Sequence, residues 1–217
     1  MNKPRTKNPT MGITRLEMFS DGVFAIAITL LILEIKIPTH QQVLESGGLY
    51  NYLLQLWPNY LSYVLSFTVI GVYWSNHHHA LSYVIKKTDH YFNLINLFFL
   101  MTIAFIPFTT AILGDFLNDE HSFGAAVSAL CIGYFFPIPM VLFMFLYAKH
   151  KKRLIDPSIS DGFLRKQIIK LLVSMAFTIV SIAFSFFYPM VSFCMILGSF
   201  VLYLLPPDMP EYKEENT

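Results

Sequence analysis

Long apolar runs separated by short polar stretches dominate the chain. Six of them approach the ~20 residues that an α-helix needs to cross the hydrocarbon core of a bilayer. They cover residues 14–37, 50–73, 91–113, 123–147, 166–187 and 190–205, the last of which is short. The pattern predicts an all-α integral membrane protein with six transmembrane helices per subunit. Prolines inside or beside these runs are expected to kink or break helices: Pro58, Pro107, Pro137, Pro139 and Pro189.

The polar ends of the chain frame this apolar region. Residues 1–13 are predicted to form a cytoplasmic N-terminal segment, 14–205 the transmembrane domain and 206–217 a disordered cytoplasmic tail. No small-residue cleavage site follows the first apolar run, so we expect a retained helix rather than a removed signal peptide. Ser160 or Asp161 is expected to cap the fifth helix.

Composition agrees with a membrane protein. Of the 217 residues, 55% are hydrophobic and only 13% are charged, which is more apolar than a soluble domain requires. The net charge of +1 gives no indication of a nucleic-acid partner. The two cysteines, Cys131 and Cys194, lie inside apolar runs without the spacing of a metal or redox motif.

The basic residues predict the orientation in the membrane. With the N-terminus inside, all of the 15 Lys and Arg residues except Lys36 fall on the cytoplasmic side. The outer loops carry acidic residues instead, among them Glu45, Asp115 and Asp119. Because cytoplasmic loops are enriched in Lys and Arg, both termini are expected to be cytoplasmic.

The first apolar run, RLEMFSDGVFAIAITLLILEIKIP, has two distinct faces. At 100° per residue, Gly22, Ile26, Thr29 or Leu30, and Leu33 form one stripe. Such a stripe ordinarily packs against lipid or a protein core, and it would also serve to line a pore. One residue of helix rotation exchanges Thr29 and Leu30, so the pattern leaves open which of them faces an axis.

Asp21 lies away from this stripe, about 140° around the helix from Ile26. A carboxylate near the start of a helix is favoured by the helix dipole, and inside a membrane it pairs with other polar groups or faces water. Three interpretations stay open: simple capping, a structural network between helices, and proton or ion chemistry. Candidate partners at the same membrane depth are Arg15 and, in YWSNHHHAL, the N–H donors of Trp74, Asn76, His77 and His78.

These two stretches resemble the transmembrane protein 175 family, the potassium-permeable channels of lysosomes and many prokaryotes. The resemblance rests on R-x-x-x-F-S-D, formed here by Arg15, Phe19, Ser20 and Asp21, and on W-S-N-H-H-H after the second segment. With a single six-helix repeat, as in the prokaryotic members, the resemblance implies a prokaryotic plasma membrane and a homotetramer assembled around the first helix. It implies a hydrophobic constriction at Ile26, Leu30 and Leu33 and a hydroxyl ring at Thr29. It also implies that Arg15, Phe19, Ser20 and Asp21, with Trp74, Asn76, His77 and His78, fasten this helix to its own subunit.

The physics of conduction is consistent with that resemblance. No TVGYG stretch occurs, so a filter of backbone carbonyls is not expected, whereas rings of isoleucine and leucine would gate by dewetting. Glu34, near the outer mouth, would raise the local cation concentration. The expected function is passive K⁺ transport, with permeating K⁺ ions but no cofactor, and with further copies of the chain and membrane lipids as partners.

Two other functions would use the histidines of the second motif. His77, His78 and His79 invite a metal or haem site, but successive residues on a helix point 100° apart, and no HExxH or CxxC accompanies them. A proton-coupled secondary transporter would use Asp21 and the histidines as a relay, yet the middle of every segment is apolar and no inverted repeat is evident. No GxSxG motif is present, and an enzyme is not expected.

Overall fold

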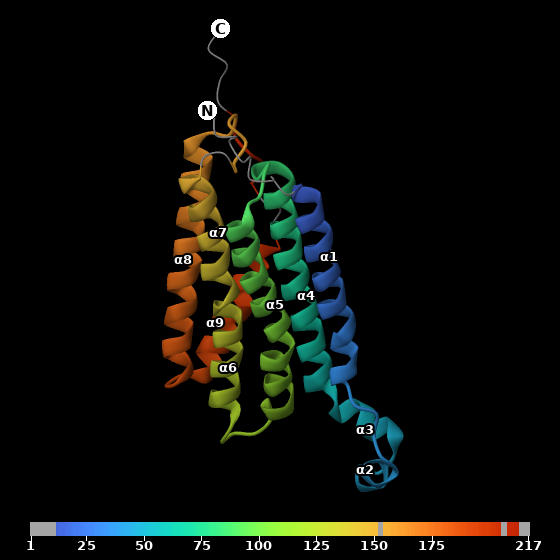
Figure 1. The fold of residues 1–217 in the computed structure, drawn as a ribbon. Coiled ribbons are helices and arrows are strands. Elements are labelled where there is room, and N and C mark those ends of the chain that lie inside the picture. Colours follow the sequence, from blue (N-terminus) through green and yellow to red (C-terminus); the bar gives the residue numbers. More distant parts are fainter. Residues whose placement is uncertain (1–11, 152–153, 205–207, 213–217) are drawn as a thin grey trace, which may run out of the picture.

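The computed structural model describes residues 12–151, 154–204 and 208–212 (Figure 1). The predicted segment 1–13 and tail 206–217 therefore lie largely outside the described residues. Long helices run side by side, and two short helices, α2 and α3, project from one end. The helical elements in order are α1 (Ile13–Leu30), η1 (Leu31–Glu34), α2 (His40–Glu45), α3 (Leu49–Gln55), α4 (Trp57–His79), η2 (Ala80–Val84), α5 (His90–Phe116), α6 (Phe123–Phe135), α7 (Pro137–His150), α8 (Asp161–Ser185) and α9 (Pro189–Tyr203).

The described helices confirm an all-α membrane protein. Four helical runs are long and apolar enough to cross a bilayer: α1 with η1, α5, α6 with α7, and α8. Helix α4 has 23 residues, a length of about 34 Å, but is less apolar, and α9 is shorter. The count of six spans stays a prediction.

The first two predicted segments end differently in the structure. Residues 31–34 tighten into a 3₁₀-helix and the chain is extended at Ile35, so the first helix does not continue to residue 37. The expected helix 50–73 is divided at Leu56, and α4 begins at Trp57 with Pro58 in its first turn, where the missing proline N–H has no cost. Helix α4 then continues through the three histidines, and a π-helical turn, η2, follows it.

Prolines and caps explain most of the remaining boundaries. Pro137 starts α7 directly after α6, which interrupts the predicted segment 123–147 at Phe136. Asp89 caps α5 by accepting from the Phe92 N–H at 3.0 Å. Ser160 accepts from the Phe163 N–H at 3.1 Å, so the serine is the predicted cap of α8, which begins five residues earlier than expected.

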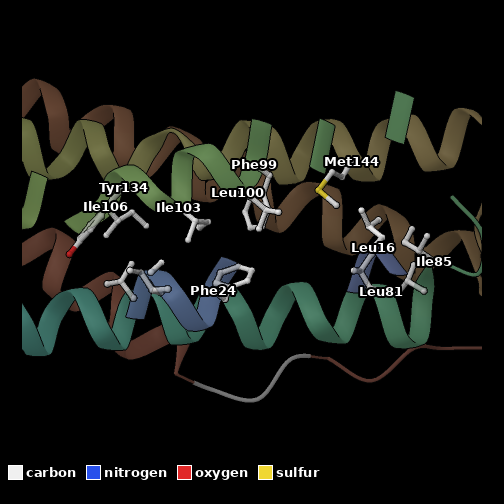
Figure 2. Packing of buried hydrophobic residues seen from close by; sticks show 14 of the residues in the cluster. Leu16, Phe24, Leu81, Ile85, Phe99, Leu100, Ile103, Ile106, Tyr134 and Met144 are labelled. Atoms are coloured by element: carbon white, nitrogen blue, oxygen red, sulfur yellow. The ribbon is translucent and has the colours of Figure 1, made fainter. Parts of the chain in front are cut away.

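Helix α5 occupies the centre of the bundle, in contact with α1, α4, α6 and α7, and α8 joins α6 and α7 to α9. Figure 2 shows the core along this helix, with Phe24 of α1 pointing toward Phe99 and Leu100. Phe24 and Phe99 are essentially inaccessible, with ring centroids 6.0 Å apart. The bundle therefore packs α1 onto α4 and α5 at one edge and α9 at the other.

Small residues allow close approach of neighbouring helices. A Cβ added at Gly133 of α6 would overlap Thr109 Oγ1 and lie 2.8 Å from Thr109 Cβ on α5. Between α6 and α8, the hydroxyls of Ser128 and Ser185 lie 2.7 Å apart. Membrane helices depend on such close packing, because lipid tails are as apolar as the side chains they would replace.

Part of the predicted disordered tail packs against the bundle. Asp208 lies 3.2 Å from Lys170, and Glu211 pairs with Lys166, both on α8. The hydrogen bond and charge of Lys170 lower the pKa of the Asp208 carboxyl below its usual value. Exposed ion pairs of this kind contribute at most about 1 kcal/mol each. Residues 208–212 are therefore held on α8, contrary to the prediction.

Gly133→Ala is expected to destabilise the folded protein by about 1–3 kcal/mol, because its methyl group would overlap Thr109. Gly124→Ala on the same helix is the matched control, since its Cβ would meet Pro189 Cγ at an ordinary 3.6 Å. Thermal unfolding of the detergent-solubilised protein measures the difference. Equal melting temperatures for the two variants would show that α5 and α6 do not approach as closely as described.

Candidate functional site: the α1 helix and its anchoring network

Helix α1 buries one face and exposes the other. The buried side chains, Leu16, Ser20, Phe24 and Ala27, recur at helical spacing, and Leu31 of η1 extends the same line. They face α4 and α5, which are the helices that α1 contacts. The two-faced first helix expected from the sequence is thus present in the single chain.

A buried chain of hydrogen bonds connects the base of α1 to α4 through α5. Ser20 Oγ donates to the Leu16 carbonyl at 2.8 Å and accepts from Asn96 Nδ2 at 3.0 Å. Asn96 Oδ1 in turn lies 2.7 Å from His77 Nε2. Because the amide oxygen can only accept, this arrangement assigns the proton to His77 Nε2. We call Ser20, Asn96 and His77 the inner chain.

Aromatic rings enclose the inner chain. The His77 imidazole stacks on Phe99, with centroids 5.1 Å apart and an interplanar angle of 11°, and Phe24 lies 5.7 Å away. All three polar side chains are buried. In such low-dielectric surroundings each hydrogen bond is strengthened, and each lost partner is correspondingly costly.

A second, more exposed set of contacts surrounds this chain. Trp74 Nε1 donates to Asp21 Oδ1 at 2.8 Å. The His78 ring stacks on Trp74, and its Nδ1 lies 3.2 Å from Glu17 Oε1. Ser82, placed by the π-helical turn η2, donates to the same Glu17 oxygen at 2.8 Å. We call Glu17, Asp21, Trp74, His78 and Ser82 the outer ring of contacts.

The structure brings together only some of the predicted network residues. Ser20, Asp21, Trp74, His77 and His78 all take part, and among these predicted residues Trp74 is the one that donates a hydrogen bond to Asp21. The Asn76 amide instead donates to the Val72 carbonyl of its own helix at 2.9 Å.

Arg15 and Phe19, which were expected to join this network, do not. Phe19 is 54% exposed. Within residues 12–151, 154–204 and 208–212, the exposed Arg15 side chain makes no hydrogen bond or ion pair. Both residues lie within about 20° of Ile26 on the helical wheel, which places them on the exposed face rather than the anchored one.

Sequence reasoning missed Glu17, Ser82 and Asn96. Asn96 is an amide inside an apolar run, where a polar side chain rarely stays unpaired. Its position in the sequence could therefore have indicated a partner on another helix. Glu17 stands one helical turn before Asp21, also a detectable spacing. Ser82 had no signal, because only the π-helical turn brings its hydroxyl to Glu17.

The predicted constriction residues lie on the exposed face of α1 and η1. Ile26, Leu30 and Leu33 are 60%, 54% and 70% exposed in the single chain, and Gly22 is also exposed. The 3₁₀ turn advances about 120° per residue, which brings Leu33 into line with Leu30. We call Gly22, Ile26, Leu30 and Leu33 the apolar stripe.

Thr29 and Glu34 flank this stripe. The exposed Thr29 hydroxyl donates to the backbone carbonyls of Ala25 and Ile26, at 2.8 and 3.1 Å. Its proton is thereby occupied, so the hydroxyl oxygen can interact with a further group only as an acceptor. Glu34 borders a small hollow with Ser62, Tyr63 and Ser66, and so lies beside α4 rather than on the stripe.

The three histidines point to different partners. His77 reaches Asn96, His78 reaches Glu17, and His79 packs its ring 4.8 Å from that of Tyr83. Among the residues that the structure describes, no three His, Cys, Asp or Glu side chains converge as metal ligands would. The geometry is that of a hydrogen-bonded junction between helices.

Comparison with known proteins places this geometry in a family. A family model described as endosomal/lysosomal potassium channel TMEM175 matches residues 15–107, which include both the stripe and the network. A potassium channel of Chamaesiphon minutus is 46% identical over 127 residues, or 58% of this chain and 61% of that channel. A potassium channel of Chryseobacterium sp. (strain P1-3) is 30% identical over 206 residues, covering 94% of this chain and 96% of that channel.

This chain belongs to the TMEM175 family. The crystal structure of a lysosomal potassium-selective channel TMEM175 homolog from Chamaesiphon minutus superimposes with a TM-score of 0.77 at 33% identity, over 89% of this chain and 96% of that one. The sequence match with the Chamaesiphon channel nevertheless spans less than two thirds of that relative's length. The resemblance deduced from R-x-x-x-F-S-D and W-S-N-H-H-H is confirmed.

In this TMEM175 member, Asn96→Leu is expected to remove the centre of the inner chain. Each buried partner left unsatisfied costs about 1–3 kcal/mol, so the yield of folded protein and its melting temperature should fall. Asn76→Leu is the control, since that amide bonds only within its own helix. Size-exclusion profiles and thermal unfolding in detergent report both effects. If the two variants behaved alike, the inner chain would not be what fixes α1.

Proposed function

We propose that four copies of this chain form a potassium-permeable channel in which the α1 helices surround a central pore. The observation that carries the proposal is the division of α1 into an anchored face and an uncovered apolar stripe. A stripe facing lipid would not need its opposite face to be locked by buried hydrogen bonds. A stripe that must meet three symmetry mates at one axis does need such a lock.

The stripe would control conduction by excluding water. Rings of Ile26, Leu30 and Leu33 side chains around a narrow axis form a hydrophobic constriction, which gates by dewetting rather than by charge. Passage through such a constriction is passive and involves no chemical step. The relatives named as potassium channels support K⁺ as the permeating ion.

Thr29 is the proposed source of ion preference. Its side chain is exposed beside the stripe, and its hydroxyl proton is held by the backbone. Four such oxygens would replace part of the hydration shell of a dehydrating K⁺ ion, as carbonyls do in other channels. Four hydroxyl oxygens are fewer and more mobile than the backbone carbonyl oxygens of a carbonyl filter. The channel should therefore discriminate only modestly between K⁺ and Na⁺. Glu34, although set beside α4, would still add negative charge near the outer mouth.

The charge distribution supports a cytoplasmic position for the end of the bundle where α1 begins. In Figure 1 this end also holds the starts of α5 and α8 and the end of α7. Every basic residue within the described ranges lies in or beside these parts except Lys36, which follows η1 at the other end. Exposed apolar side chains on α5 and α8, such as Phe98 and Val173, would face membrane lipid.

A proton-coupled transporter receives less support. The ionisable side chains of the network, Glu17, Asp21, His77 and His78, gather near one end of α1 and α4. A relay would require such groups to continue toward the middle of the bundle, where α1 carries Phe24, Ala25 and Ile26.

The proposal is tested with purified protein in liposomes. K⁺ should flow down its own gradient without ATP or a second ion, and the detergent-corrected mass should correspond to four copies of the 25.0 kDa chain. A monomeric particle would contradict a pore formed by four α1 helices. Strict dependence of K⁺ flux on a coupled ion would favour the transporter.

Ile26→Asn is expected to raise K⁺ conductance severalfold and to lower the K⁺/Na⁺ permeability ratio, because an amide ring would wet the constriction. Val173→Asn is the control, with a comparable exposed fraction of 63% on α8, a helix that packs on α6, α7 and α9. Single-channel recording in planar bilayers measures both quantities. Unchanged currents in Ile26→Asn would show that the stripe does not line the pore.

Thr29→Val, which keeps the shape of the side chain but removes the hydroxyl, is expected to bring the K⁺/Na⁺ permeability ratio closer to one. Thr29→Ser, which keeps the hydroxyl, should retain most of the preference. Reversal potentials under bi-ionic conditions provide the ratio. A normal ratio in Thr29→Val would show that another group, such as Leu30, faces the axis instead.

A further inference from the structure

The exposed face of α1 does not end at Gly22. Counted at 100° per residue from Ile26, Phe19 lies at about 20° and Arg15 at about −20°, nearer the centre of the face than Thr29. Phe19 is 54% exposed and Arg15 is exposed, as the stripe residues are. The first turns of α1 therefore continue the same line, ending in a guanidinium group.

The charges at the base of α1 are sorted by face. Glu17 and Asp21 lie about 180° and 140° from Ile26 and are engaged by their own subunit, through Ser82 and His78 and through Trp74. Arg15, the cation between them and the helix start, points to the opposite side. The carboxylates that would neutralise Arg15 are thus turned away from it.

The position of Arg15 has no stabilising explanation within α1. It lies in the first turn, where its backbone N–H bonds to the Gly12 carbonyl at 3.1 Å. A cation at a helix N-terminus opposes the macrodipole and is unfavourable, more so where several helix starts converge. Within the described ranges no carboxylate offsets this cost, which argues for a role outside the single subunit.

We propose that Arg15 forms a ring of four positive charges at the pore mouth where the α1 helices begin, and that this ring opposes the approach of cations from that side. The proposal rests on the four-copy pore. A positive ring lowers the local K⁺ concentration at that mouth and leaves the opposite mouth unaffected. Currents that start from the Arg15 side are therefore smaller than currents in the other direction, and the channel rectifies.

Arg15→Gln is expected to raise the current carried from that side by about two- to fourfold at low salt, with little change in the opposite direction. Arg15→Lys should restore the asymmetry, because the charge returns. The difference should vanish near 1 M salt, where the Debye length falls to about 3 Å from about 30 Å at 0.01 M. Arg165→Gln is the control: an exposed cation of α8, a helix that packs on α6, α7 and α9.

A chemical version of the test separates charge from folding. In a Cys194→Ser background, which removes the exposed native thiol, Arg15→Cys would be treated with impermeant thiol reagents of either charge. A cationic adduct should restore rectification and an anionic adduct should reverse it. Each reagent should act only from the bath that faces the mouth where α1 begins.

The outcomes distinguish this proposal from the channel itself. Robust currents that respond to Ile26→Asn but show equal changes in both directions, or none, in Arg15→Gln would overturn the charge ring alone. Absence of any ion flux in the parent protein would overturn the channel. Rectification lost in Arg15→Lys as fully as in Arg15→Gln would show that Arg15 acts through its shape rather than its charge.

Discussion

The buried hydrogen-bond chain Ser20–Asn96–His77 is the constraint on which the rest of this structure depends. In a bilayer, apolar side chains gain little by exchanging lipid for one another, so hydrophobicity alone does not determine how a helix is rotated about its axis. A polar contact does, because rotation of α1 by one residue, about 100°, would break the Asn96–Ser20 bond and leave the Asn96 amide without its acceptor in an apolar environment. The anchoring network therefore sets which residues of α1 remain uncovered.

That constraint links the two sequence motifs, R-x-x-x-F-S-D and W-S-N-H-H-H. The serine and aspartate of the first motif point away from the stripe. Asp21 accepts from Trp74 of the second motif, and Ser20 is linked to His77 of that motif through Asn96. The arginine and phenylalanine of the first motif lie on the other side of the same helix. The motif thus encodes two surfaces at once, one that holds α1 to its subunit and one that the proposed tetramer would turn toward its axis.

Interruptions of regular α-helical geometry also determine where the side chains of the stripe and the network lie. The 3₁₀ segment η1 realigns Leu33 with Leu30, and the π-helical turn η2 delivers Ser82 to Glu17. Proline breaks before α4 and α7 determine where those helices begin. Glycine and serine contacts allow α5, α6 and α8 to approach closely enough to support the anchored helix.

The sequence by itself determined the membrane class, the family and the division of α1 into two faces, because these depend on run length, local motifs and helical periodicity. It also predicted the bond partners of Asp21 to within a few candidates, since topology placed both motifs at one depth. Only the tertiary structure decided that Asn96 of α5 joins Ser20 to His77, that Asn76 stays within α4 and that Arg15 leaves the network. These outcomes depend on the rotation of each helix about its axis and on 3₁₀ and π turns. Packing between segments that are distant in the sequence determines the helix rotations and these turns, and a local sequence pattern does not predict such packing.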